Sequence, residues 1–295
     1  MHAETVLTLI ANGTTLPDIA AFVSPGDAQH IVHHTPLNAA QTAMDVYFAV
    51  PPVAVDALYQ RAAALQVDAV IQPVADREKR LLISDMDSTM IEQECIDELA
   101  DKAGIKPQVA AITERAMQGE LEFESALRAR VALLKGLPES VLEDVFVHHL
   151  TVMPGAATLV ATMKARGASA HLVSGGFTFF TARIARQLGF DTHEANQLIV
   201  HEGVLSGQVT HPILNKDSKL ESLHAHAKSR AVKLSQTMAV GDGANDLPML
   251  LAAGLGVAYH AKPVVAEQAA ASIRFNDLTA LLYLQGIAQH AWVIT

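Results

Sequence analysis

Residues 81–89 read Leu-Leu-Ile-Ser-Asp-Met-Asp-Ser-Thr, and this stretch decides the fold. Its apolar run, Leu81 to Ile83, ends at two acids, Asp85 and Asp87, which are separated by one residue. A short apolar run followed by polar residues is typical of a buried parallel strand that ends at its carboxyl edge. Because ligands of open α/β sheets bind at that edge, we expect both carboxylates to face a site.

The close spacing of these two acids also indicates a chemistry. Two neighbouring carboxylates repel each other unless a positive charge neutralises them, and Mg²⁺ does so where phosphate is also present. Near such a cation Asp85 stays ionised and can attack phosphorus, while Asp87 can protonate the leaving oxygen and later activate water. The alternative is a solvated loop with an acid that caps a helix, and the short Asp-x-Asp-x-Thr pattern does not decide between the two.

The composition limits the class of protein. A chain of 295 residues, of which 50% are hydrophobic and 18% charged, predicts about two folded domains. A net charge of -10 argues against binding of nucleic acid or of an anionic membrane. The single cysteine, Cys95, fits a reducing cytoplasm. No uncharged apolar run reaches membrane-spanning length, and the first residues are not typical of a secretory signal.

Residues 1–75 predict a small unit of their own, in the order β-α-β-β-α-β of the ferredoxin-like fold. Its two helices are expected over 16–23 and 53–65. By this pattern the unit resembles the small amino-acid-sensing (ACT-like) domains that accompany metabolic enzymes. A stabilising or dimerising appendage and a regulatory unit both stay open. Residues 76–80, Asp-Arg-Glu-Lys-Arg, are interpreted as a solvated linker.

Residues 81–295 alternate between strand and helix patterns, which predicts a doubly wound parallel sheet. A helical insert at about 96–150 follows directly after the two acids. An insert at this place is typical of a lid over a site, although an ordinary helical layer gives the same pattern. Within the insert, Arg128 and Arg130 are candidates to bind a substrate carboxylate in a bidentate manner.

Three further loops carry polar residues. Ser174-Gly175-Gly176 follows an apolar strand and precedes a helix, an arrangement that favours anion binding by backbone N–H groups. A lysine at the start of a helix opposes the helix dipole, so we expect one to face a phosphate or the Asp85 carboxylate. Lys219 is preferred and Lys216 is the fallback. Residues 241–246, Gly-Asp-Gly-Ala-Asn-Asp, follow another apolar strand and suit cation coordination.

In this order the four loops resemble the motifs of the haloacid dehalogenase superfamily of phosphotransfer enzymes. Over about residues 80–290 the chain is further similar to phosphoserine phosphatases, and the similarity includes the insert. It is carried there by Glu92-Gln93-Glu94, Arg115-Ala116-Met117, Glu122-Phe123 and Leu127-Arg128-Ala129-Arg130-Val131. The resemblance implies Mg²⁺-dependent hydrolysis of O-phospho-L-serine through an aspartyl-phosphate, the last step of serine biosynthesis.

The resemblance also implies a role for each matching residue, with Asp85 as nucleophile and Asp87 as general acid and base. The implied Mg²⁺ ligands are Asp85, the backbone carbonyl of Asp87, Asp242 and, in support, Asp246. The implied phosphate-binding residues are Ser174, Gly175, Lys219 and, at the edge, Asn245. The rest of the substrate would meet Glu94 through its amino group, Arg130 through its carboxylate, and Met117 and Phe123 as a cover. Cys95 departs from the pattern, because a hydroxyl residue is commoner beside that glutamate.

Other functions remain open at this point. A phosphotransferase that passes the phosphoryl group to another alcohol, such as homoserine, would use the same residues. An amino-acid-sensing protein on a phosphatase scaffold would bind without turnover, but the intact Asp85, Asp87, Lys219 and Asp242 weigh against it. A dehalogenase uses no Mg²⁺ and would leave Asp87 and Asp242 without a purpose. The expected partner is a small-molecule substrate, and a homodimer stays open.

Overall fold

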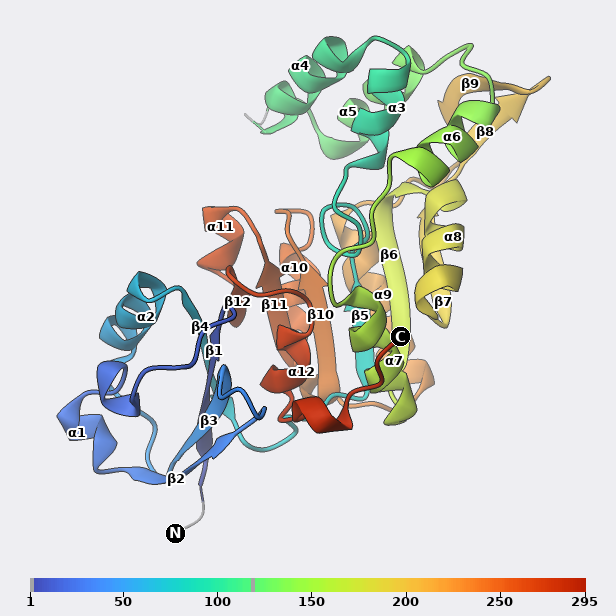
Figure 1. Ribbon diagram of the computed structural model, residues 1–295. Helices are drawn as coiled ribbons and strands as arrows, with labels where there is room; N and C mark the ends of the chain where they lie inside the picture. Colours follow the sequence, from blue (N-terminus) through green and yellow to red (C-terminus); the bar gives the residue numbers. More distant parts are fainter. Residues whose placement is uncertain (1–2, 118–119) are drawn as a thin grey trace.

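The computed structural model describes residues 3–117 and 120–295, without the side chain of Met117. Figure 1 shows three parts: an N-terminal unit in blue, a central α/β core, and a cap above the carboxyl edge of the core sheet. No helix among the described residues is both long and apolar enough to cross a lipid bilayer.

The core is built on one parallel sheet of six strands in the order β12-β11-β10-β5-β6-β7. The strands are β5 (Leu81–Ser84), β6 (Ser169–Phe177), β7 (Thr192–Asn196), β10 (Thr237–Gly241), β11 (Leu255–Tyr259) and β12 (Ala271–Ile273). Strand β5 is central and pairs with β6 on one side and with β10 on the other. The chain therefore winds in both directions from β5, and a crevice forms at the carboxyl end of such a switch point.

Helices cover both faces of this sheet. One face carries α7 (Ala156–Ala165), α8 (Thr178–Leu188) and α12 (Ala280–Leu284), and the other carries α9 (Lys216–Ser229), α10 (Leu247–Ala252) and α11 (Pro263–Ala266). Strand β5 explains why: Leu82 packs in the first layer, whereas Leu81 and Ile83 pack in the second. Successive side chains of a strand point to opposite faces, so an uninterrupted apolar strand requires both layers. The predicted doubly wound fold is confirmed.

The cap contains the four helices that the insert predicts. They are α3 (Cys95–Lys102), α4 (Lys106–Met117), α5 (Phe123–Leu133) and α6 (Ser140–His148). The hairpin of β8 (Leu198–His201) and β9 (Val204–Val209) also joins the cap, although it lies far along the chain (Figure 1). The backbone N–H of Gly136 donates to the Leu205 carbonyl at 2.8 Å, and the Leu205 N–H donates to the Leu137 carbonyl at 2.8 Å.

The N-terminal unit has an antiparallel sheet in the order β2-β3-β1-β4, which confirms the ferredoxin-like arrangement. Its elements are β1 (Thr5–Ala11), α1 (Pro25–Ala28), β2 (Ile31–Pro36), β3 (Ala43–Phe48), α2 (Val55–Ala64) and β4 (Val67–Pro73). The helix expected over 16–23 is wrong: the chain forms a 3₁₀ turn at Ile19–Ala21 and then the one-turn α1. Pro25 cannot continue a helix, and Ser24 instead caps a new one through the Asp27 N–H.

The expectation that 76–80 is solvated holds for the exposed Asp76 and Arg80 but is wrong for Arg77 and Lys79, which are 7% and 5% exposed. The Arg77 guanidinium binds both oxygens of Asp45, at 2.6 and 2.7 Å, and its Nε donates to the Leu284 carbonyl at 2.8 Å. Lys79 Nζ donates to the Asp76 and Ser235 carbonyls. These contacts join the N-terminal sheet to the core, so the charge run serves an interface. Short 3₁₀ turns at Leu234–Gln236 and Gln289–Ala291 complete the elements.

Candidate active site

Asp85 lies at the carboxyl end of β5 and is 5% exposed. Its Oδ1 accepts the Met86 N–H at 2.7 Å, and its Oδ2 lies 2.7 Å from Lys219 Nζ. Burial and the charge of Asp246 raise the pKa of Asp85 well above its usual value, and the ammonium of Lys219 opposes that shift. The lysine is therefore what favours the ionised carboxylate in this buried position.

Lys219 comes from the first turn of α9 and is 2% exposed. Besides Asp85, its Nζ contacts Asp246 Oδ1 at 2.6 Å. Burial by itself disfavours the ammonium, but the carboxylates of Asp246 and Asp85 raise the pKa of Lys219 above its usual value. Asn215 caps the helix by accepting the N–H groups of Asp217 and Ser218, which fixes the start of α9. Lys216, the fallback of the sequence analysis, is exposed one turn earlier.

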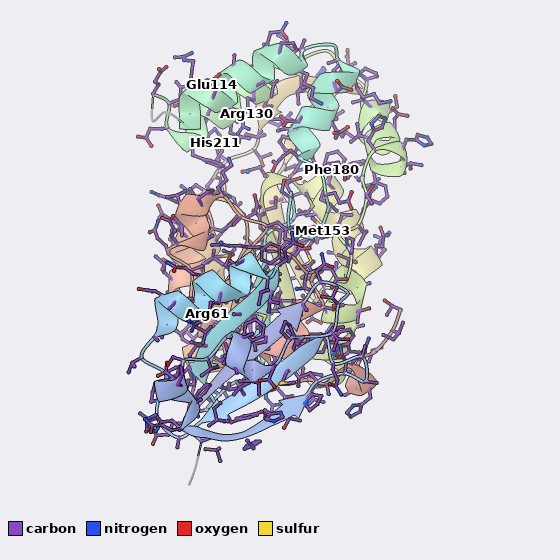
Figure 2. The ribbon with its side chains drawn as sticks, turned by 60° about the vertical axis from the view of Figure 1, so that its left-hand side comes forward. Arg61, Glu114, Arg130, Met153, Phe180 and His211 are labelled. Atoms are coloured by element: carbon purple, nitrogen blue, oxygen red, sulfur yellow. The ribbon has the colours of Figure 1, made fainter. Side chains whose placement is uncertain are left out.

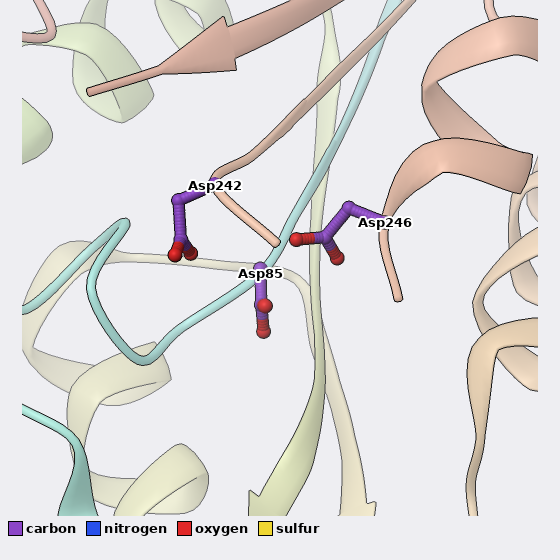
Figure 3. A group of neighbouring side chains, drawn as sticks. All are labelled: Asp85, Asp242 and Asp246. Atoms are coloured by element: carbon purple, nitrogen blue, oxygen red, sulfur yellow. The ribbon is translucent and has the colours of Figure 1, made fainter. Parts of the chain in front are cut away.

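Asp85, Asp242 and Asp246 form an acidic cluster in which one oxygen of each lies within 4.8 Å of the others (Figure 3). Asp242 follows β10, accepts the Thr89 hydroxyl at 3.1 Å, and has its pKa raised to about 6 by burial and by Asp246. With all groups ionised, three carboxylates and the ammonium of Lys219 leave two negative charges. Clustered carboxylate oxygens with this excess charge suit one hard divalent cation such as Mg²⁺. The two oxygens of Asp246 already accept hydrogen bonds from the Gly243 N–H and from Lys219 Nζ. Asp246 is therefore better placed as a secondary ligand of the cation than as a main one.

Asp87 is held beside this cluster by groups from two segments. Its Oδ1 accepts the Cys95 N–H at 3.0 Å and its Oδ2 accepts the Ser174 hydroxyl at 3.3 Å. A Cβ on Gly176 would lie 2.6 Å from Asp87 Oδ2, so only glycine allows this approach. Burial raises the pKa of Asp87, which favours the protonated form that a general acid needs. Burial likewise raises the pKa of the Cys95 thiol well above its usual value, which suits a packing role.

A cavity of about 770 Å³ separates Asp87 and the acidic cluster from the cap. On its cap side, Glu94 Oε1 accepts the Ser88 hydroxyl at 2.7 Å. Ser88 has a φ of 52°, a backbone conformation rare for serine, and this loop turn carries its hydroxyl to Glu94. The Glu94 side chain is open to the cavity, yet the surrounding protein and the charge of Asp87 raise its pKa to about 7. Asn245 lies on the core side of the same cavity.

Arg130 enters this cavity from α5 (Figure 2). Its Nε donates to the Ala126 carbonyl at 3.3 Å and its Nη1 to the Thr113 hydroxyl at 3.5 Å, both of which are long. Burial lowers the pKa of Arg130, and nearby acids oppose that effect. Arg128, the other candidate, instead binds Glu124 and the ring of His211 at the surface. Of the two arginines, only Arg130 is placed to meet a ligand.

The cap already touches the carboxyl end of β6, next to Ser174. The Phe123 ring lies so close to Gly175 that a Cβ there would be 3.1 Å from Phe123 Cζ. The position predicted for Met117 lies outside the described side chains. Apart from Arg128 and Lys216, which lie at the surface, the other site residues predicted from the sequence line this cavity or belong to the acidic cluster and its lysine at the cavity floor.

Three contacts were not predicted. The Thr89 hydroxyl binds Asp242, and the Ser88 hydroxyl binds Glu94. Asp97 lines the same cavity as Arg130, and its negative charge acts to raise the pKa of both Glu94 and Arg130. Asp97 was detectable, because a residue three positions after Glu94 lies on the same face of α3. The contact of Ser88 was not detectable from the sequence, because it depends on a backbone conformation that is rare for serine.

A model of haloacid dehalogenase-like hydrolases matches residues 82–251, which include every catalytic candidate. The chain belongs to that family. Among the relatives of this chain, a phosphoserine phosphatase from Streptococcus thermophilus is 48% identical over 200 residues, which are 68% of this chain and 93% of the relative. One from Mycobacterium tuberculosis is 42% identical over 254 residues, 84% of this chain and 62% of the relative.

A solved structure agrees over nearly the whole chain. The hydrolase of this family from Salmonella enterica serovar Typhi has a TM-score of 0.81 at 31% identity, covering 95% of this chain and 98% of its own. The chain spans less than two thirds of the length of the curated relatives from Mycobacterium tuberculosis, Streptomyces coelicolor and Vibrio cholerae.

Proposed function

We propose that this hydrolase converts O-phospho-L-serine to L-serine and phosphate in a Mg²⁺-dependent reaction. The observation that carries the proposal is one cavity with two unlike ends. Its floor holds Asp85, Lys219 and the acidic cluster, and its cap side holds Glu94 and Arg130. A phosphate ester of a zwitterionic amino acid needs this combination of groups.

At the floor, Asp85 is the nucleophile and forms an aspartyl-phosphate, since Lys219 favours its ionised form. Asp87, with its raised pKa, protonates the leaving serine oxygen and then accepts a proton from the attacking water. Ser174, Gly175 and Lys219 bind the phosphoryl oxygens, and Asn245 lies at their edge. Phosphoryl transfer depends mainly on such positioning and charge neutralisation.

On the cap side, Glu94 binds the substrate ammonium and Arg130 binds its carboxylate. The remaining donors of the Arg130 guanidinium have no hydrogen-bond partner among the described residues, so they are available to a carboxylate. Phe123, and Met117 by resemblance, cover the substrate. Closure of the cap excludes bulk water and brings Arg130 toward the phosphate end.

The fit of a divalent cation rests on the excess of two negative charges in the acidic cluster. Asp85, Asp242 and the Asp87 backbone carbonyl would hold it, with Asp246 in support. When bound, Mg²⁺ supplies positive charge that reduces repulsion between the phosphoryl oxygens and the carboxylates.

The experiment that tests this function separates hydrolysis from transfer to another alcohol. The protein is incubated with Mg²⁺, phosphoserine and homoserine, and both products are quantified. The proposal predicts free phosphate and serine in equal amounts. Phosphohomoserine in excess of free phosphate would contradict hydrolysis and establish a phosphotransferase, and amino-acid binding without turnover would establish a sensory protein.

We further propose that this reaction is the last step of serine biosynthesis, because its product is serine. We also propose that it takes place in the reducing cytoplasm, which is consistent with the single free and buried cysteine, Cys95. The amino-acid-sensing role of the N-terminal unit and a homodimer stay predictions.

A further inference from the structure

A second cavity, of about 790 Å³, lies between the N-terminal unit and the core, and shares no lining residue with the catalytic cavity. Three parts of the molecule contribute to its wall. Asn12 comes from the N-terminal unit, Tyr259 and Asp277 come from the core, and Glu92 and Met153 come from the two connections to the cap. Figure 2 labels Met153 at this junction.

Tyr259 gives this cavity a polar group without a partner. Its side chain is 0% exposed, and its hydroxyl has no hydrogen-bond partner among the described residues. Buried tyrosine hydroxyls are normally hydrogen-bonded, so an unpaired one on a cavity wall indicates a ligand position. Burial and the charges of Asp277, Asp68 and Glu92 raise the pKa of Tyr259, so the hydroxyl stays protonated.

The charge and shape of the wall define the ligand. Glu92 and Asp277 contribute carboxylates, His260 contributes an imidazole whose Nε2 lies 3.0 Å from the Asn276 carbonyl, and no lysine or arginine is present among the described residues that line the cavity. Tyr283 and Trp292 add aromatic rings, whose faces attract cations. An electronegative aromatic cavity repels phosphate esters, so it is not a second position for the proposed substrate.

We propose that this cavity binds a small organic cation with an ammonium group and a short hydrocarbon part. The ammonium lies between the Glu92 carboxylate and the Tyr259 hydroxyl, and the hydrocarbon part packs on the aromatic rings.

The position of Glu92 gives this ligand a route to the cap. The Glu92 N–H donates to the Thr151 carbonyl at 3.0 Å, and the Met153 N–H donates to the Met90 carbonyl at 2.9 Å. These bonds join the two connections through which the cap meets the core. A ligand that ties Glu92 to the core therefore restrains the base of the cap, and it changes the equilibrium between open and closed forms if it binds them unequally.

Isothermal titration calorimetry on the full chain tests the site independently of any activity. Putrescine, L-lysine and choline are the probes, with sodium chloride and magnesium chloride at matched ionic strength as blanks. We expect saturable binding of at least one organic cation at one site per chain. Heats no larger than those of the blanks for all three probes would overturn the proposal.

Two variants locate the binding. Glu92→Gln removes the charge from an exposed residue, and Tyr259→Phe removes only the unpaired hydroxyl. We expect Glu92→Gln to weaken binding at least tenfold and Tyr259→Phe to weaken it severalfold. Glu221→Gln, the same change at an exposed position on α9, is the matched control and should leave the Kd unchanged. Binding that neither test variant weakens, or that the control weakens equally, would place the cation elsewhere and refute the site.

Discussion

Lys219→Met tests which lysine supports the reaction. The substitution keeps most of the side-chain volume but removes the ammonium that lies 2.7 Å from Asp85 and 2.6 Å from Asp246. The buried carboxylates of Asp85 and Asp246 and the half-buried carboxylate of Asp242 then have no cationic side chain, and a proton is taken up in its place. A protonated Asp85 is a poor nucleophile, so both phosphate binding and attack are weakened.

The size of the effect follows from burial. Lys219 is 2% exposed, and breaking a buried ion pair by removing one partner costs about 3–5 kcal/mol. If that loss is expressed in the transition state, kcat/KM falls by about 10²- to 10⁴-fold, at ~1.4 kcal/mol for each factor of ten. The loss of unfolding free energy is smaller, because proton uptake relieves part of the repulsion. That loss shrinks further as the pH falls, since the carboxylates then protonate in the folded variant.

The assay measures kcat/KM for phosphoserine and for p-nitrophenyl phosphate in saturating Mg²⁺. Both should fall, because the lysine acts on the phosphate that they share. Lys216→Met is the matched control: it makes the same change three residues earlier on α9, where the side chain is exposed, and should keep activity within about twofold. Retention of more than a tenth of the activity by Lys219→Met, or an equal loss in Lys216→Met, would refute the reasoning.

Four further outcomes are expected. Asp85→Asn should abolish turnover while circular dichroism stays unchanged, and retained turnover would remove Asp85 as nucleophile. Arg130→Met should lower kcat/KM for phosphoserine about 100-fold, through lost charged hydrogen bonds, and spare p-nitrophenyl phosphate; equal losses would contradict a carboxylate contact. Because the pKa of Glu94 is raised to about 7, lowering the pH from 8 to 6 should raise KM for phosphoserine but not for the aryl ester. Because the pKa of Asp242 is raised to about 6, Mg²⁺ should bind more weakly at pH 5.5 than at pH 7.5 in calorimetry, and equal affinities would exclude Asp242 as a ligand.

The core and the place of the site could be predicted from sequence because local patterns determine them. Leu81 to Ile83 lacks polar residues on either face, which requires a sheet covered on both sides. Parallel strands end at one edge, so Asp85, Ser174 and Asp242 had to come near one another once their strands were neighbours. Lys219 was preferred on a different argument, because a lysine at the start of a helix opposes the helix dipole unless it faces an anion.

What could not be predicted depends on contacts between distant segments. The sequence does not reveal the burial of Arg77, because its partner Asp45 lies 32 residues away on a strand whose position relative to the core cannot be read from the sequence pattern. The pairing of the hairpin β8–β9 with the cap depends on how the insert folds over the core. The helix expected over 16–23 does not form, because the residues that follow it, Ser24 and Pro25, start the separate one-turn helix α1.

The measurement that tests the central claim most directly is phosphate release from O-phospho-L-serine, with and without Mg²⁺, beside a panel of other phosphomonoesters. The account predicts release that requires Mg²⁺ and a strong preference for phosphoserine, since Glu94 and Arg130 recognise the amino acid and the acidic cluster holds the cation. Mg²⁺-dependent release without that preference would keep the catalytic floor but contradict the roles of Glu94 and Arg130. Absence of release from every ester would contradict the proposed function itself.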